Sequence, residues 1–412
     1  MKICIFTETY YPVVGGGETQ AKLLAEALTT KGHSVIVLTR RSDLLLKNYE
    51  QYGAVHVYRL PPVGRGQLKK WGLLFSSFPM LIHLQRQYDL IFVSGFRIIG
   101  IAGILVSRIF HKKCILKSDS QGEMSGAFFV NGLKKFGLSP SWLPFKLFLN
   151  IRNKVLAGAD GFSAISADIA EEFSMAGIKP KLIHIIPNSV DTARFYPVTR
   201  RQKIALRKKL GIPQNAMIVI YTGRIVSYKG LPLLLKVWRD LYKKHNKILL
   251  LLVGTGGLDM YNCEIELRSY VRENWLDQYI RFTGSVQNVA EYLQASDIFA
   301  FPTEDDALPS SLIEAMACAL PIVTTPVGAI KAIVKDGENG IVIQPGDYQQ
   351  LYQALETLMV NPHLASLLGQ AALKTIQSQF SSDIVIERYL SLFRQTTNRA
   401  ASPLGPYLYP DN

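Results

Sequence analysis

Short apolar runs alternate with amphipathic segments along almost the whole chain, and this alternation limits the fold more than any other feature. A first set of runs begins with KICIFTE (residues 2–8) and ends with LIHIIPN (residues 182–188). A second set begins with MIVIYTG (residues 217–223) and ends with GIVIQ (residues 340–344). Strands that are separated by helices pair in parallel and form doubly wound sheets. The pattern therefore predicts an α/β protein with two Rossmann-like domains.

A basic stretch without strand signals (residues 196–216) separates the two sets. We predict an amino-terminal domain over residues 1–197 and a carboxyl-terminal domain over residues 198–380. By analogy with other two-domain folds, the last helix, at about residues 381–397, is expected to return to the first domain. Residues 398–412 contain proline and glycine and are expected to form a flexible tail. Ligands of such sheets bind beyond the carboxyl ends of the strands, so a cleft between two facing domains is the expected active site.

The composition narrows the classes of partner. The chain has 412 residues, 48% of them hydrophobic, which is enough for two cores, and a formal net charge of +14. This charge suits nucleic acid, an anionic membrane surface or phosphorylated substrates. A nucleic-acid binder usually shows a basic stripe with interleaved aromatic residues or a known module, and neither is found. We therefore expect no nucleic-acid partner.

Two segments, residues 67–86 and 131–154, mix Lys and Arg with Trp, Phe and Leu. This mixture is typical of a protein surface that rests on anionic lipid. The alternative interpretation is a pair of partly buried helices with solvated lysines.

The four cysteines are far apart and match no metal site or disulfide framework, which suggests a reducing compartment. The most apolar stretch, residues 98–110, is too short to span a bilayer. We expect a cytoplasmic protein, soluble or peripheral on the inner face of the membrane.

The segment PTEDDALPSSLIEAMACALPIVTTPVG (residues 302–328) has the strongest functional signal. An acidic loop leads into a helix that is expected to begin near Ser311, and the amino end of a helix binds phosphate or hydroxyl groups through its backbone N–H groups. Asp306 and Glu314 are two carboxylates that suit the recognition of sugar or ribose hydroxyls. The alternatives are structural: Ser311 and Glu314 match a capping box, and Asp306 could be an exposed turn residue.

A second segment, GRIVSYKG (residues 223–230), places Gly223, Arg224 and Lys229 between a strand and a helix. Two cations there suit a diphosphate, and they stabilise leaving-group charge without a metal ion. The alternative is a pair of solvated surface cations. Weaker candidates follow other strands. Glycine lets the backbone approach a ligand closely, and the candidate glycines are Gly16, Gly17 and Gly254. Val286 is a further candidate, through its backbone.

Three motifs together resemble glycosyltransferase family 4, also described as glycosyl transferases group 1. They are ALPSSLIEAMACALPIV (residues 307–323), GRIVSYKG, and IPNSVDTARFYP (residues 186–197). The resemblance extends over nearly the whole chain. It implies the GT-B fold, with two Rossmann-like domains facing across a cleft. It also implies a retaining transfer from a nucleoside-diphosphate sugar, a UDP- or GDP-sugar, without a required metal or cofactor.

Carried over by position, the resemblance assigns Arg224 and Lys229 to the diphosphate and Glu314 to the ribose. Asp306 falls at the first acidic position of the family's pair, near the transferred sugar, where a Glu is usual. The backbone N–H groups of Leu308 and Ser310 would contact the donor. Many members carry a His after the fourth strand, but this chain has ILKSDSQGE there. Asp119 is therefore the candidate for acceptor or sugar contact, with helix capping as its structural alternative.

The expected function is the transfer of a hexose-type sugar to a hydroxyl group of a glycan or lipid-linked glycan in cell-surface polysaccharide synthesis. Two alternatives stay open. One is a sugar-nucleotide 2-epimerase on a similar fold, and the few histidines near the strand ends argue against it. The other is a non-catalytic sugar-nucleotide-binding relative, which the Asp at position 306 and the missing His would allow.

Overall fold

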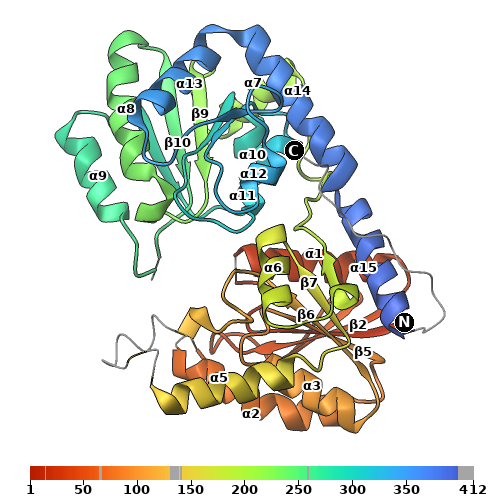
Figure 1. Ribbon diagram of the computed structural model, residues 1–412. Helices are drawn as coiled ribbons and strands as arrows, with labels where there is room; N and C mark the ends of the chain where they lie inside the picture. The colour runs from red at the N-terminus through yellow and green to blue at the C-terminus, as the bar shows by residue number, and fades with distance from the viewer. Residues whose placement is uncertain (14, 65–66, 130–138, 140–141, 258, 398–412) are drawn as a thin grey trace. The chain divides into compact units, whose positions relative to one another are not determined.

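The computed structural model describes residues 1–397 apart from residues 14, 65–66, 130–138, 140–141 and 258 (Figure 1). It divides into two compact units, residues 1–188 with the segment that starts at Ser382, and Ser189–Ser381. The boundary follows Asn188 and so precedes the expected position at Pro197. The expected tail, residues 398–412, lies outside the described residues, as do residues 131–138 and 140–141 of the second basic-apolar segment.

Within its described residues, the first unit is built on an eight-stranded sheet with the order β3-β4-β2-β1-β5-β6-β7-β8. All neighbouring strands are parallel except β3 and β4, which form an antiparallel pair at one edge. The strands are β1 (Lys2–Thr7), β2 (Ser34–Arg40), β3 (Tyr49–Tyr52), β4 (Val55–Leu60), β5 (Leu90–Ser94), β6 (Lys113–Ser118), β7 (Gly161–Ala164) and β8 (Ile183–Ile185). The hairpin of β3 and β4 is absent from the expected elements.

Helices cover both faces of this sheet (Figure 1). They are α1 (Gly16–Thr30), α2 (Gln67–His83), α3 (Gly100–Ile109), α5 (Leu143–Leu156), α6 (Ala167–Met175) and α15 (Ser382–Thr397), with short 3-10 helices η1 (Ala127–Phe129) and η2 (Pro180–Leu182). The last helix, α15, packs against α1, and its apolar residues belong to the same buried cluster as β1 and β5. The carboxyl-terminal segment is therefore part of the core of the first unit.

The second unit has a six-stranded parallel sheet in its described residues, with the order β11-β10-β9-β12-β13-β14. The strands are β9 (Met217–Thr222), β10 (Ile248–Val253), β11 (Ile280–Gly284), β12 (Ile298–Phe301), β13 (Ile322–Thr324) and β14 (Ile341–Val342). The helices are α7 (Arg200–Lys209), η3 (Ser227–Lys229), α8 (Leu231–Lys244), α9 (Glu264–Glu273), α10 (Val289–Gln294), α11 (Ser310–Ala317), α12 (Ile330–Ile333), α13 (Tyr348–Val360) and α14 (Pro362–Gln379).

Burial on both faces explains why the strands read as continuous apolar runs. Every residue of β5 and of β10 is buried, as expected for central strands of a parallel sheet that is covered by helices on both sides. Side-chain caps fix several helix starts. Thr199 and Gln202 form a capping box at α7, and Asn361 caps α14, in which Pro362 occupies the first turn. Among the described residues, no helix has the length and apolar character needed to cross a membrane.

Candidate active site

The loops that follow β9 and β12 lie at the switch point of the second sheet. Strand β9 pairs with β10 on one side and with β12 on the other, so the chain builds the sheet outward in both directions from this pair. Ligands of open α/β sheets bind beyond the carboxyl ends of the strands at such a point. Lys229 follows β9 and Asp306 follows β12. The strand order therefore brings two of the predicted site residues together.

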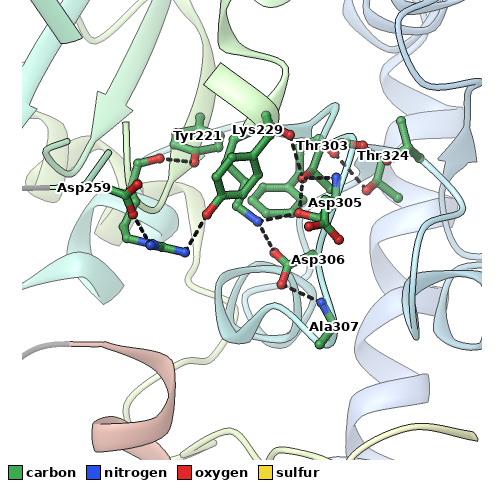
Figure 2. Close-up of polar contacts among 12 residues, drawn as sticks. Tyr221, Lys229, Asp259, Thr303, Asp305, Asp306, Ala307 and Thr324 are labelled. Atoms are coloured by element: carbon green, nitrogen blue, oxygen red, sulfur yellow. Dashed lines mark hydrogen bonds and ion pairs between the residues drawn. The ribbon is translucent and has the colours of Figure 1, made fainter. Parts of the chain in front are cut away.

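Lys229 lies at the centre of this cluster (Figure 2). Its Nζ donates hydrogen bonds to Asp306 Oδ2 at 2.7 Å and to the backbone oxygen of Asp305 at 2.8 Å. The ammonium group also lies over the ring of Tyr228, 4.8 Å from the ring centroid. Only 6% of the residue is exposed. The interpretation of Lys229 as a solvated surface cation is therefore wrong.

Burial lowers the pKa of Lys229, and the charge of Asp306 together with its hydrogen bond opposes this effect. A cation that is largely removed from water interacts more strongly with a nearby anion than an exposed one does. The same shielding makes a fixed cation effective against charge that develops during a reaction. Lys229 is thus placed where it could stabilise a phosphate group.

Two glycines hold the loops of the cluster close together. Gly230 has a left-handed backbone with φ of 71°, and a Cβ there would collide with the carbonyl oxygen of Pro302. Gly328 has φ of 51°, and a Cβ there would collide with the backbone oxygen of Asp306. Side chains at either position would force the loops apart. These contacts fix Asp306 relative to Lys229.

Arg224 is the second predicted cation, and it is more accessible. Tyr221 Oη donates to the backbone oxygen of Arg224 at 2.7 Å, which fixes the turn after β9. The guanidinium group forms an ion pair with Asp259 and donates to Tyr228 Oη at 2.7 Å. Its side chain is 59% exposed. Arg224 is therefore open to a ligand, but its charge is already paired with the carboxylate of Asp259.

Helix α11 begins one residue earlier than expected. Its first residue is Ser310 and its N-cap is Pro309, which makes no side-chain cap. Ser311 lies inside the helix, so the capping box of Ser311 and Glu314 that the sequence suggested does not form. Leu312 N in the first turn donates to the backbone oxygen of Pro309 at 3.2 Å, while the first N–H groups of an α-helix otherwise point away from the helix without an acceptor in it. Ser310 Oγ is buried without a hydrogen-bond partner in the described structure. A polar ligand at this helix end would satisfy these groups.

Glu314 lies on α11 and is half-buried. Burial raises the pKa of its carboxyl group to about 7, and the positive charge of Arg194 opposes this rise. An ionised carboxylate in this place is costly unless hydroxyl or N–H groups donate to it. Glu314 thus has the properties of a carboxylate that is kept for a ligand rather than for a cap.

The remaining predicted residues of the second unit follow neighbouring strands. Gly223 after β9 and Gly254 after β10 have positive φ angles, and a Cβ at Gly254 would collide with the backbone oxygen of Gly223. Val286 follows β11 and is half-buried. Leu308 precedes α11, and its side chain is buried. Together with Lys229 and Asp306, these positions lie at the carboxyl ends of β9, β10, β11 and β12.

The first unit has its own polar cluster at the ends of β5 and β6. Asp119 follows β6 and forms an ion pair with Lys117, and Ser94 Oγ donates to Asp119 Oδ2 at 2.8 Å. Burial alone lowers the pKa of Lys117, but the charge of Asp119 leaves that pKa raised overall. An added Cβ at Gly95 or at Gly17 would lie 3.4 or 3.5 Å from Asp119 Oδ2. Asp119 therefore lies close to the first turn of α1 and to the loop that follows β5.

The glycine run between the first strand and the first helix differs from the expected loop. Helix α1 begins at Gly16 with Gly15 as its N-cap, so Gly16 and Gly17 form its first turn. Glu18 also lies in this turn, and its carboxylate accepts a hydrogen bond from Thr9 Oγ1. A Cβ at Gly17 would lie in ordinary contact with Asp119 Oδ2, so the first turn of α1 passes close to this carboxylate. Gly17 thus lies beside Asp119, and Gly16 lies in the same helical turn.

Two family models together match most of the chain. The model for glycosyl transferases group 1 matches residues 202–375, and the model for glycosyltransferase family 4 matches residues 14–194. These ranges correspond to the second and the first unit. The chain is a group 1, family 4 glycosyltransferase. It transfers a sugar in glycoconjugate biosynthesis.

Relatives of this glycosyltransferase are similar over almost its full length. An uncharacterized glycosyltransferase of Methanocaldococcus jannaschii is 25% identical, and the match covers 97% of this chain and 99% of the relative. The alpha-monoglucosyldiacylglycerol synthase of Streptococcus pneumoniae is 23% identical, with 95% of this chain and 86% of the relative covered. The matched regions therefore include both units of this chain.

Solved structures support the GT-B fold. Sucrose-phosphate synthase from Thermosynechococcus elongatus superposes with a TM-score of 0.78 at 21% identity, covering 97% of this chain and all of that one. The Anabaena protein HepE, solved in complex with UDP-glucose, gives a TM-score of 0.70 at 20% identity, with 95% and 99% covered. The prediction of a GT-B fold is confirmed.

Sequence reasoning missed two residues of the glycosyltransferase's site. Asp259 lies in the loop between β10 and α9, and Tyr228 lies in η3 beside Lys229. Tyr228 lies within the motif GRIVSYKG, so its position next to Lys229 could have marked it as a site residue. Asp259 has no comparable signal, because its pairing with Arg224 depends on how the loop after β10 folds.

Proposed function

We propose that this glycosyltransferase transfers a hexose, with retention of configuration, from a UDP- or GDP-sugar to a hydroxyl group of a glycan or lipid-linked glycan. The observation that carries this proposal is the position of Lys229. A buried lysine at the switch point, bonded to the loop that leads into α11, suits the diphosphate of a sugar nucleotide. The complex of HepE with UDP-glucose supports a donor of this class.

The proposed donor site uses the residues of the second unit. Arg224 and Lys229 would bind the diphosphate, and the N–H groups of Leu308 and Ser310 would contact it or the sugar. Glu314 would accept hydrogen bonds from the ribose hydroxyls, which would compensate the cost of its ionisation. Asp306 would contact the transferred sugar. Gly223, Gly254 and Val286 would allow the nucleotide to approach the backbone.

The proposed reaction needs no strong protein base. The acceptor oxygen bonds to the anomeric carbon on the face that the leaving group departs from, and the bond from that carbon to the diphosphate oxygen breaks. The electron pair stays on the diphosphate, where Arg224 and Lys229 stabilise the charge. The acceptor proton passes to the leaving phosphate. The products are the glycosylated acceptor and a nucleoside diphosphate.

The first unit would orient the acceptor. We propose that Asp119 accepts a hydrogen bond from an acceptor or sugar hydroxyl, because its carboxylate follows β6 at the carboxyl edge of the first sheet, close to Gly17 and Gly95. Lys117 forms an ion pair with this carboxylate. The name of the pneumococcal relative, a synthase of a glucosylated diacylglycerol, supports an acceptor with a lipid part.

The test is a melting-temperature screen of the purified protein against UDP-, GDP- and ADP-sugars, followed by transfer assays with the sugar nucleotide that stabilises it most. The double variant Arg224→Ala/Lys229→Ala should lose both stabilisation and transfer. Lys236→Ala removes an exposed lysine of α8 and is the matched control. Unchanged transfer by the double variant would overturn the proposed donor site. Epimer formed from the donor alone would identify an epimerase instead.

A further inference from the structure

Helix α5 of the first unit presents an apolar stripe on its outer side. Leu143, Leu147 and Ile151 follow one another at intervals of four residues and are 76%, 58% and 58% exposed. Residues four apart lie on the same side of a helix. The outer side of a helix that packs on a globular core is normally polar. In α5, both the inner and the outer side are apolar.

The orientation of α5 is fixed, so the stripe cannot turn inward. Arg152 of α5 is fully buried, and its guanidinium group donates to the backbone oxygen of Arg97 at 2.7 Å and to that of Met124 at 3.0 Å. Phe145 and Leu156 occupy the core on the same side. A rotation of the helix would break these bonds and expose the buried residues instead. The exposed stripe is therefore a stable property of the fold.

Helix α2 extends the apolar surface beside α5. Trp71, Phe75 and Ile82 recur at helical spacing and are exposed, Phe75 to 70%. The ring of Trp71 contacts Phe148 of α5, with 5.5 Å between the centroids. Helix α3 packs against both α2 and α5. The three helices lie on the same face of the sheet (Figure 1). We call the outer surface of these helices the α2–α5 face.

The charged residues within the three helices are all basic. The sequences of α2, α3 and α5 contain no Asp or Glu. Exposed basic residues lie beside the apolar stripes: Lys146 and Lys154 on α5, Arg108 on α3, and Arg86 just after α2. A face that buries against another protein domain has no need to exclude every acidic residue. Apolar side chains together with one sign of charge match the interior and the anionic headgroups of a lipid surface.

We propose that the α2–α5 face docks on an anionic lipid bilayer, with the stripe of α5 inserted among the headgroups and the lysines bound to phosphate. The role of this docking in the reaction depends on the proposed function: a lipid-linked acceptor lies at such a surface, and docking would bring the enzyme to it. The docking itself concerns residues of the first unit only. It can therefore be tested without any sugar donor.

The test is co-sedimentation of the full chain with vesicles of phosphatidylcholine, with and without phosphatidylglycerol. The protein should bind the phosphatidylglycerol vesicles at least about tenfold more strongly, and high salt should remove this preference. Leu147→Glu/Ile151→Glu should lower binding by about tenfold or more, because it places two like charges against the anionic surface. Ile265→Glu changes a residue of α9 that is 74% exposed and is the matched control.

Three results would overturn the proposal: no binding of the unmodified chain to phosphatidylglycerol vesicles, equal binding by the double variant, or equal loss in the control variant. A dimer in solution that Leu147→Glu/Ile151→Glu converts to a monomer would identify a second copy as the occupant, and would also overturn it. Stabilisation by the sugar nucleotide, measured on the same samples, shows that the variants are folded. Loss of that stabilisation in every sample would count against the proposed donor site, not against the docking face.

Discussion

The substitution Glu314→Gln should stabilise the ligand-free protein while weakening its binding of a sugar nucleotide. The pKa of Glu314 is raised to about 7 by burial, from an ordinary value of 4.5. The native state therefore disfavours the ionised carboxylate relative to the unfolded state. A glutamine has nearly the same shape and stays neutral. The substitution removes the cost of ionisation at neutral and alkaline pH.

The magnitude and its pH dependence follow from the two pKa values. Below pH 4.5 the carboxyl group is protonated in both states and costs nothing. Between pH 4.5 and about 7 the native state holds more protons than the unfolded state, so stability falls as the pH rises. Above pH 7 the buried, ionised carboxylate lowers the free energy of unfolding by roughly 3 kcal/mol. Since Glu314 is only half-buried, contact with water reduces this cost, and we expect a gain of about 1–3 kcal/mol at pH 8.

The assay is urea unfolding of the unmodified chain and of Glu314→Gln at pH 5 and pH 8, with Glu338→Gln, which alters an exposed glutamate of the same unit, as the control. Relative to the unmodified chain, Glu314→Gln should have a clearly higher free energy of unfolding at pH 8 and a nearly equal one at pH 5. Calorimetric titration at pH 8 should show donor binding weakened by about tenfold or more, because hydrogen bonds to a charged acceptor are lost. Equal or lower stability of Glu314→Gln at pH 8 would refute the reasoning.

Three further substitutions test the surroundings of the site. Asp259→Asn should raise donor affinity by a few fold in titration calorimetry, because it frees the exposed Arg224 from a competing carboxylate; weaker binding would show that Asp259 orients the arginine instead. Gly230→Ala should lower the free energy of unfolding by about 2 kcal/mol or more, since its Cβ would meet the carbonyl oxygen of Pro302; an unchanged urea midpoint would contradict this. Asp306→Glu adds one methylene, and competition assays between donor sugars should show a changed sugar preference with unchanged affinity for the nucleoside diphosphate alone.

Much of the fold could be predicted because parallel strands are buried on both faces. The run ILLLLV of β10 is apolar at every position and only six residues long, as expected for a strand that is covered on both faces. The hairpin of β3 and β4 was missed for the opposite reason. It lies at the sheet edge, β3 is short and partly exposed, and β4 alternates buried and half-buried residues. The alternation of apolar and polar residues in VHVYRL would have predicted β4 as a half-buried strand.

The site was predictable residue by residue, but its contacts were not. The positions of Lys229 and Asp306 at strand ends follow from local patterns. Their pairing across 77 residues depends on β9 lying beside β12, which a single sequence does not state. The first residue of α11 was also not predicted correctly, for a different reason. The pattern of Ser311 and Glu314 matches a capping box, but Pro309 becomes the N-cap and moves the helix start by one residue.

Each unit places a buried lysine beside an aspartate at the carboxyl ends of its strands, Lys229 with Asp306 and Lys117 with Asp119. A buried ion pair of this kind adds little to stability, since desolvation offsets the attraction, so its position needs another reason. In the proposed function, the diphosphate competes with Asp306 for the ammonium group of Lys229. When Lys229 gives its bond with Asp306 Oδ2 to phosphate instead, that oxygen can accept a bond from a sugar hydroxyl. Binding of the diphosphate would thus prepare the carboxylate for the sugar that is attached to it.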